Sequence, residues 1–149
     1  MSAKAAMHIS RRRACEADVP FLRDLRAQTM EQHHLAAGIP QSYAENEAKV
    51  RAHFECAEIL ELDGQCIGLL KILREPTEWR VVQVQLLPEY QGSGIGGRLL
   101  GALVAQARDA GVSIALSVLK GNPARHLYER LGFEITSEGE RVFHMQAAA

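Results

Sequence analysis

The chain has 149 residues, of which 47% are hydrophobic, and its formal net charge is −1. This length favours one domain with a sizeable core, and the balanced charge argues against nucleic acid as the main partner. No stretch approaches the roughly 20 apolar residues of a membrane span, and the N-terminus lacks the apolar run of a secretory signal. We therefore expect a single domain over residues 1–149 in the cytoplasm, without a membrane partner.

The first half of the chain predicts a strand, two helices and then three strands. Asp18 and Pro20 are typical of the start of the first helix, and Asp63-Gly64 is typical of a two-residue hairpin turn between strands. Both strands of that hairpin carry apolar residues on both faces, which is typical of a sheet covered on both sides. The expected elements are a strand at 7–15, a helix from Asp18 through His34, a helix at 42–53, and strands at 56–62, 65–73 and 79–87.

The second half contains the clearest helix. Six apolar residues between positions 95 and 107 recur at helical spacing, and Gly111 ends the pattern. The remaining elements are a strand at 112–119, a short helix after Asn122-Pro123, and two strands around a turn at Gly139. The order β-α-α-β-β-β-α-β-α-β-β predicts a mixed α/β fold, because strands and helices do not alternate as in a doubly wound sheet.

Four glycines precede the long helix in the segment PEYQGSGIGG, residues 88–97. Backbone N–H groups at a helix N-terminus have no intrahelical partner and carry partial positive charge. Glycines let those groups approach an anion without a Cβ in the way. The segment therefore predicts a phosphate-binding loop, although a glycine-rich turn joining strand to helix remains an alternative.

Gly92-Ser-Gly94-Ile-Gly-Gly97 also matches the dinucleotide fingerprint G-x-G-x-x-G. That fingerprint requires a strand running directly into the first glycine and an acidic residue at the end of the next strand. Here Pro88–Gln91 intervene, and the next strand ends in Ser117-Val-Leu-Lys120. Arg98-Leu99 after the last glycine likewise excludes a Walker A loop. A nucleotide-binding oxidoreductase is therefore disfavoured.

A third pattern, Gln/Arg-x-x-Gly-x-Gly/Ala, fits Gln91–Gly96. With VQVQLLP before it and NPARHLYERLGF after it, the sequence resembles the GNAT superfamily of acetyl-CoA-dependent N-acyltransferases. The resemblance covers residues from about 56 to the C-terminus, whereas 1–55 match only as strand-helix-helix. It implies a mostly antiparallel central sheet of six to seven strands with helices on both faces.

The same resemblance implies a role for each motif. The pantetheine arm of the coenzyme would pair with the backbone of Leu86 and Leu87, and Asn122 would hydrogen-bond the coenzyme. Tyr128 would protonate the departing thiolate, although its place on an apolar stripe also fits a core tyrosine. The pyrophosphate of acetyl-CoA would be held by Gln91, Gly92, Ser93, Gly94, Ile95 and Gly96.

The general base is not evident. Many relatives carry a carboxylate on the strand before the loop, where this chain has Gln83 and Gln85, and glutamine cannot take a proton at neutral pH. These side chains can instead align the substrate or an ordered water. His33 has a suitable ordinary pKa, and other candidates are His34, Glu31 and Glu78. A surface histidine pair and a water chain to bulk solvent are the alternatives.

The sequence predicts an N-acetyltransferase that moves the acetyl group of acetyl-CoA to a primary amine by direct attack in a ternary complex. The acceptor would be a small-molecule or peptide amine. A catalytically silent acyl-CoA-binding regulatory module is the second hypothesis. We expect no metal, since no histidine or cysteine pair has ligand spacing, and we leave a homodimer through the last strands open.

Overall fold

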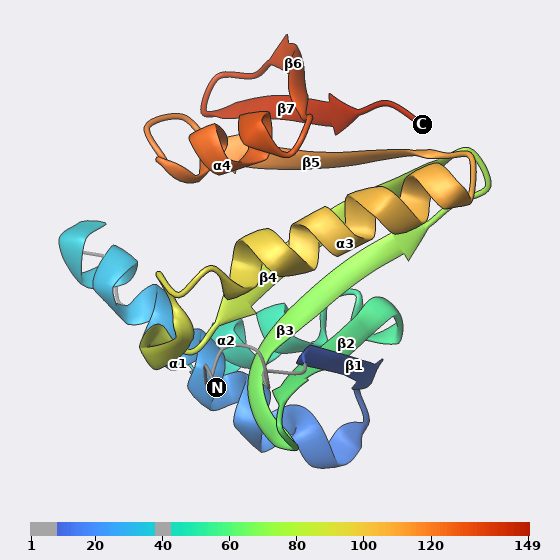
Figure 1. Ribbon diagram of the computed structural model, residues 1–149. Coiled ribbons are helices and arrows are strands. Elements are labelled where there is room, and N and C mark those ends of the chain that lie inside the picture. Colours follow the sequence, from blue (N-terminus) through green and yellow to red (C-terminus); the bar gives the residue numbers. More distant parts are fainter. Residues whose placement is uncertain (1–8, 38–42) are drawn as a thin grey trace. The chain divides into compact units, whose positions relative to one another are not determined.

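The computed structural model describes residues 9–37 and 43–149, with side chains described at 9–29 and 45–149. Seven strands form one sheet in the order β1-β2-β3-β4-β5-β7-β6 (Figure 1). The strands are β1 (Ile9–Arg13), β2 (Ala57–Leu62), β3 (Gln65–Arg74), β4 (Glu78–Leu86), β5 (Ser113–Leu119), β6 (Glu134–Glu138) and β7 (Val142–Ala147). The helices are α1 (Val19–Ala37), α2 (Tyr43–Arg51), α3 (Ile95–Asp109) and α4 (Ala124–Arg130).

The pairing of the strands confirms the mixed, mostly antiparallel α/β fold. β4 pairs with β5 in parallel, and the ladder joins Glu78–Arg80 to Ser113–Ala115. The pairs β1–β2, β2–β3, β5–β7 and β6–β7 are antiparallel. The element order is the one that the sequence predicts, with short 3-10 turns added before α1, β2 and α3.

The chain divides into two compact units, and the division passes through β3 and β4. One unit comprises the described residues up to Lys71 together with Gln83–Gln91, and the other comprises Ile72–Val82 and Gly92–Ala149. The first unit therefore holds α1, α2 and the C-terminal part of β4. The second holds α3, α4 and the strands β5, β6 and β7.

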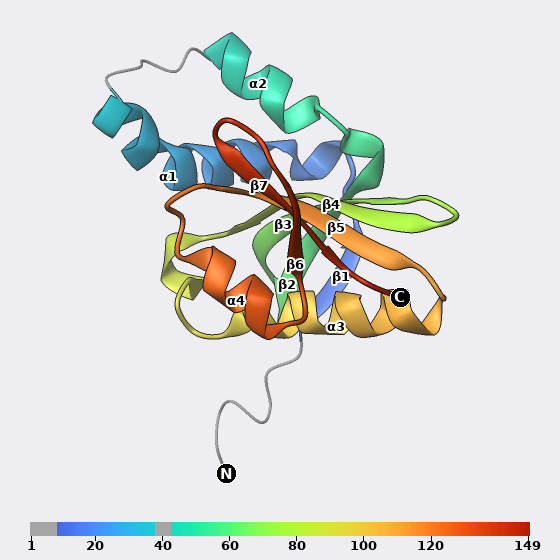
Figure 2. The same cartoon turned by 90° about the horizontal axis from the view of Figure 1, so that it is seen from above.

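In the first unit, α1 and α2 lie beside each other (Figure 2). The cluster beneath them includes Leu22 and Leu25 of α1, Val50 of α2, and Ile59 and Leu69 of the strands, all nearly inaccessible to solvent. The hairpin turn between β2 and β3 is the predicted one, with φ of 50° at Asp63 and 83° at Gly64. Burial of this apolar face stabilises the unit by removing its side chains from water.

The start of α1 differs from the prediction. Asp18 is buried in a short 3-10 turn before α1, and its carboxylate accepts hydrogen bonds from the Cys15 backbone N–H at 2.8 Å and from both terminal nitrogens of Arg12 at 2.7 and 2.8 Å. It therefore stabilises the turn and β1 rather than capping α1. Arg12 also donates to Glu61 at 3.2 Å.

In the second unit, α3 packs its predicted apolar face inward. These residues are all buried, namely Ile95, Leu99, Leu100, Leu103, Val104 and Ala107. The first half of α3 also contacts α4. A Cβ at Gly97 would lie 3.3 Å from a methyl carbon of Leu127, and a Cβ at Gly101 would lie 3.6 Å from one of Leu131. Small residues at these two positions therefore let α4 approach α3 closely.

The three cysteines, Cys15, Cys56 and Cys66, are free thiols. Glu61 pairs with Cys66 across the β2–β3 hairpin, in the register that the sequence predicts. None of the described helices has both the length and the apolar character needed to cross a membrane. Among the side chains described at 9–29 and 45–149, no group of three metal-binding residues gathers.

Candidate active site

The glycine loop, defined here as Gly92–Gly96, leads into the N-terminus of α3 in the second unit. Gly92 and Gly94 have φ of 75° and 85°, the left-handed region that side chains rarely adopt. A Cβ at Gly92, Gly94 or Gly96 would meet no atom within 4 Å. The backbone conformation requires glycine at the first two positions, and open space lies beside all three.

The first backbone N–H groups of α3 are available to a ligand. Gly94 is the N-cap residue and offers no side-chain cap, and the first intrahelical bond of the segment runs from Arg98 N–H to the Gly94 carbonyl at 3.1 Å. The N–H groups of Ile95, Gly96 and Gly97 precede that bond. The side chain of Ile95 is buried in the core, so only its backbone can contact an anion here. The helix dipole adds partial positive charge at this point.

Tyr128 lies on α4, the helix that packs against the start of α3. Its ring is partly buried and meets Phe133 edge-on, with ring centroids 6.1 Å apart. Its hydroxyl makes no hydrogen bond to any residue whose side chain the structure describes. Burial raises the pKa of Tyr128 above its ordinary value, so the phenol holds its proton at neutral pH. A partly buried, protonated phenol without an internal partner is suited to donate to a ligand.

Asn122 has a local structural role. It is exposed, and its side-chain oxygen accepts a hydrogen bond from the Ala124 N–H at 2.9 Å, at the start of α4. This contact orients the turn before α4. The side-chain NH₂ group remains able to donate to a ligand, so a contact between Asn122 and the coenzyme stays a prediction.

The end of β4 lies in the first unit and makes contacts of its own. Leu87 N–H donates to the Ile67 carbonyl at 2.9 Å, and the side-chain amide of Gln91 donates to the Leu86 carbonyl at 2.9 Å. The parallel ladder with β5 ends at Arg80, and β4 continues from Val81 to Leu86 beyond it. Gln91, predicted to bind pyrophosphate, is therefore engaged with the backbone of Leu86.

Gln83 and Gln85 form a polar chain with α1. The Gln83 amide donates to the Gln85 side-chain oxygen at 2.8 Å, and the Gln85 amide donates to the Thr29 hydroxyl at 3.0 Å. The Thr29 hydroxyl in turn donates to the Leu25 carbonyl at 2.8 Å. These neutral groups orient one another, and none of them is a base at neutral pH.

Other predicted base candidates fall elsewhere. The side chains of Glu31, His33 and His34 lie outside the described set, although their backbone belongs to α1. Glu78 stands at the opposite end of β4 from Leu86, and its carboxylate is bound by Arg80 at 3.3 Å and Gln146 at 2.9 Å. The structure therefore gives Glu78 a structural role.

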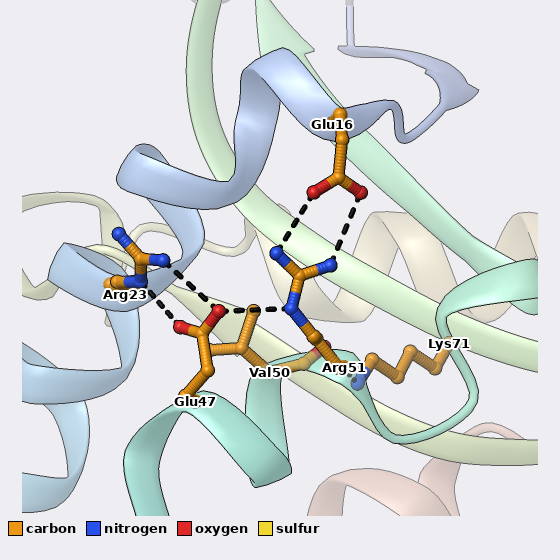
Figure 3. Close-up of polar contacts among 6 residues, drawn as sticks. All are labelled: Glu16, Arg23, Glu47, Val50, Arg51 and Lys71. Atoms are coloured by element: carbon orange, nitrogen blue, oxygen red, sulfur yellow. Dashed lines mark hydrogen bonds and ion pairs between the residues drawn. The ribbon is translucent and has the colours of Figure 1, made fainter. Parts of the chain in front are cut away.

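Several residues around α2 carry polar contacts that the sequence analysis missed (Figure 3). The buried ammonium of Lys71 on β3 donates to the carbonyls of Lys49 and Val50, at 3.2 and 3.1 Å, and to that of Ala52. Burial lowers the pKa of Lys71. In the sequence, Lys71 lies within an apolar strand segment and resembles another core position. No local pattern indicates that its ammonium binds carbonyls at the C-terminal end of α2.

Two arginines complete the attachment of α2 (Figure 3). Arg23 of α1 donates to Glu47 of α2 at 2.5 and 3.0 Å. Arg51 donates to Glu47 at 2.9 Å and to Glu16 at 2.8 and 3.1 Å. Only the Glu47–Arg51 pair has a sequence signal, because its members are four residues apart on one helix.

The sequence model of the Acetyltransferase (GNAT) family matches residues 19–133. The ribosomal protein bS18-alanine N-acetyltransferase of Haemophilus influenzae is 39% identical over 72 residues, which cover 48% of this chain and 49% of that protein. The amino-acid acetyltransferase of Neisseria meningitidis is 31% identical over 134 residues, covering 89% of this chain and 29% of that protein. This chain thus spans about half the length of the first relative and under a third of the length of the second.

The fold also matches solved structures. The PaiA N-acetyltransferase of Thermoplasma acidophilum, solved in complex with coenzyme A, has a TM-score of 0.71 with 18% sequence identity. The match covers 95% of this chain and 99% of that one. At this identity the comparison establishes the fold.

Proposed function

The chain belongs to the acetyltransferase (GNAT) family, and we propose that it transfers the acetyl group of acetyl-CoA to a primary amine by direct attack in a ternary complex. The observation that carries the proposal is the glycine loop, with its left-handed glycines, open surroundings and uncapped N–H groups at the start of α3. Such a helix N-terminus suits a pyrophosphate. The neighbouring PaiA structure, which contains coenzyme A, supports that ligand.

The C-terminal part of β4 would hold the pantetheine arm. Beyond the short parallel ladder, the strand from Val81 to Leu86 offers backbone donors and acceptors along one edge. An amide-containing arm can add to such an edge as an extra strand does. A backbone N–H beside Leu86 would then polarise the thioester carbonyl as negative charge develops on its oxygen.

Tyr128 would supply the proton that the departing thiolate gains. Its raised pKa keeps the hydroxyl protonated at neutral pH, and the hydroxyl lacks a partner among the described side chains. The attacking amine must lose a proton, and the Gln83–Gln85–Thr29 chain cannot accept it. That chain would instead orient the amine or a water that relays its proton outward. His33 remains a candidate base.

The names of two relatives support a proposal for the class of amine that this chain acetylates. The first name specifies the nitrogen of an alanine in a ribosomal protein, and the second specifies amino acids. A small-molecule or peptide amine is therefore the proposed acceptor.

The test begins with calorimetric titration of acetyl-CoA, followed by thiol release with a panel of amines. Gly94→Asp places a side chain and a negative charge in the glycine loop, and it should abolish acetyl-CoA binding. Gly111→Asp is the matched control, because Gly111 follows α3 with φ of 73° and equally open space. Equal affinity in both folded variants would refute the loop assignment.

Turnover then separates the proposal from its alternative. Thiol release that requires an amine supports an N-acetyltransferase. Tight acetyl-CoA binding without turnover on any amine would favour the silent regulatory module instead. The lack of a carboxylate at Gln83 and Gln85 is the observation behind that alternative.

A further inference from the structure

Arg26 stands apart from the other partly buried arginines of the first unit. Arg12 and Arg23 each donate to a carboxylate at 3.2 Å or less, and Arg11 lies 3.7 Å from Glu58. The partly buried guanidinium of Arg26 has no hydrogen bond or ion pair with any described residue of the chain. Its Nε atom is buried without an acceptor.

An unpartnered guanidinium in this position is energetically unfavourable. A buried donor without an acceptor costs free energy, and partial burial disfavours the charged form of the guanidinium. Burial lowers the pKa of Arg26, and no acidic group among the described residues offsets this effect. The charge of Arg26 also contributes to lowering the pKa of Lys71, which lies close enough to be affected by it. Lys71 itself is fully occupied by three carbonyls.

The location of Arg26 connects it to the polar chain on β4. Arg26 precedes Thr29 by three residues on α1 and follows the buried Leu22 by four, so the three share one face of the helix. Thr29 accepts the hydrogen bond from Gln85, and Gln85 directly precedes Leu86, where the thioester is proposed to lie. The neutral Gln83–Gln85–Thr29 chain offers hydrogen bonds but no charge to balance Arg26.

We propose that Arg26 binds the α-carboxylate of the acceptor and that the acceptor is a free amino acid. A planar guanidinium can hold a carboxylate through two parallel hydrogen bonds. Fixing the carboxylate also fixes the α-amine, which is only one carbon away, and this orientation favours attack on the thioester. A protein N-terminus has no free α-carboxylate and would leave Arg26 unpaired. The inference rests on the proposed acetyl transfer and specifies its substrate.

The test compares free L-amino acids with the matching amino-acid amides as acceptors, using thiol release from acetyl-CoA. The wild-type protein should prefer the free acids. Arg26→Gln should lower kcat/KM for the acids by about 10- to 100-fold, the range expected for a lost hydrogen bond to a charged group, and change the amides by less than about 3-fold. Arg26→Lys should restore part of the preference. Arg13→Gln, an exposed arginine on the edge strand β1, should leave both unchanged.

A second measurement separates ligand binding from a structural role. Arg26→Gln removes an uncompensated charge, so its melting temperature without ligand should equal or exceed that of the wild type. Arg23→Gln breaks an ion pair with Glu47 and should melt lower. A free amino acid that is a substrate should raise the melting temperature of the wild type in the presence of coenzyme A, but not that of Arg26→Gln.

Three results would overturn the inference. The first is equal use of acids and amides by the wild type, and the second is an equal loss for both in Arg26→Gln. The third is a melting temperature of Arg26→Gln as low as that of Arg23→Gln. In each case acetyl-CoA binding and transfer would still support the proposed function. Absence of acetyl-CoA binding would refute the proposed function, and the substrate assignment with it.

Discussion

Gly68→Ala tests whether the approach of β3 to β4 positions the acetyl-CoA arm. An alanine Cβ at this position would lie 2.9 Å from a methyl carbon of Leu86 and 3.3 Å from the carbonyl carbon of Gln85, with the Gln85 carbonyl oxygen closer still. Backbone atoms cannot rotate aside as a flexible side chain does, so the two strands must separate locally. Overpacking of this kind costs about 1–3 kcal/mol, and a weakened bond from Leu87 N–H to Ile67 adds about 1 kcal/mol.

We therefore expect Gly68→Ala to lower the free energy of unfolding by about 2–4 kcal/mol, which corresponds to roughly 5–15 °C in melting temperature for a chain of this size. The functional effect follows from the same displacement, because Gln85 directly precedes Leu86 and Leu87. A displaced backbone at Leu86 and Leu87 would no longer lie where it would pair with the pantetheine arm, so the affinity for acetyl-CoA should fall. Urea unfolding measures the first effect, and calorimetric titration with acetyl-CoA well below the melting temperature measures the second.

Gly64→Ala is the matched control in the same hairpin. Gly64 has φ of 83°, and a Cβ there would meet no atom within 4 Å. The variant should lose about 1–2 kcal/mol through backbone strain alone and keep the acetyl-CoA affinity of the wild type. Unchanged affinity in a folded Gly68→Ala variant, or an equal loss of affinity in both variants, would refute the assignment of the coenzyme arm to this end of β4.

Three further predictions concern other parts of the chain. Tyr128→Phe should lower kcat by about 100-fold with acetyl-CoA affinity within about twofold, and steady-state kinetics with wild-type kcat would contradict the role of Tyr128 as the acid. Hydrogen bonds from Arg12 lower the pKa of Asp18 from 3.8 to about 2, so its carboxylate contributes about 2 kcal/mol above pH 3.8 that is lost as pH falls through 2. In urea unfolding at pH 7, Asp18→Asn should have a free energy of unfolding lower than that of the wild type by this amount. Its stability should also fall less than that of the wild type between pH 4 and 2. An equal fall in both proteins would argue against the pairing of Asp18 with Arg12. Lys71→Met removes two hydrogen bonds to carbonyls of α2 and one to the carbonyl of Ala52, and its free energy of unfolding at pH 7 should be about 2 kcal/mol lower than that of the wild type. Burial lowers the pKa of Lys71 below its ordinary value of 10.5. Between the lowered pKa and 10.5 the folded state therefore binds fewer protons than the unfolded state, so the stability of the wild type should increase as the pH rises through this range. Lys71→Met should not show this increase.

Local patterns in the sequence were sufficient for most of the fold. The apolar repeat from Ile95 to Ala107 predicts the buried face of α3, and Asp63-Gly64 predicts the hairpin turn with its register. The glycine pattern at 92–96 predicts a loop before the long helix, and the structure places Gly92 and Gly94 of that loop in the left-handed region. In each case the determining residues lie within one turn of helix or one hairpin, so the physics that fixes the structure is contained in a short window.

Long-range pairing escaped the sequence analysis. Asp18 looks like a helix cap, but Arg12 and the Cys15 backbone bind its carboxylate. Gln91 matches a pyrophosphate-binding pattern, yet its amide is engaged with the Leu86 carbonyl. An amide or carboxylate has several partners within reach in any sequence. The choice depends on which partner the packing brings to hydrogen-bond distance.

The arginines of the first unit show how packing gives different partners to residues that look alike in the sequence. Arg23 and Arg26 lie three residues apart on α1 and look equivalent in the sequence. The partner of Arg23 is Glu47, 24 residues away, whereas no described carboxylate pairs with Arg26. Carboxylates of the chain neutralise the other partly buried arginines of this unit. Arg26 would instead be neutralised by an anion from outside the chain. Because the phosphates of the coenzyme are assigned to the glycine loop, the carboxylate of the acceptor is the anion that this arginine would bind.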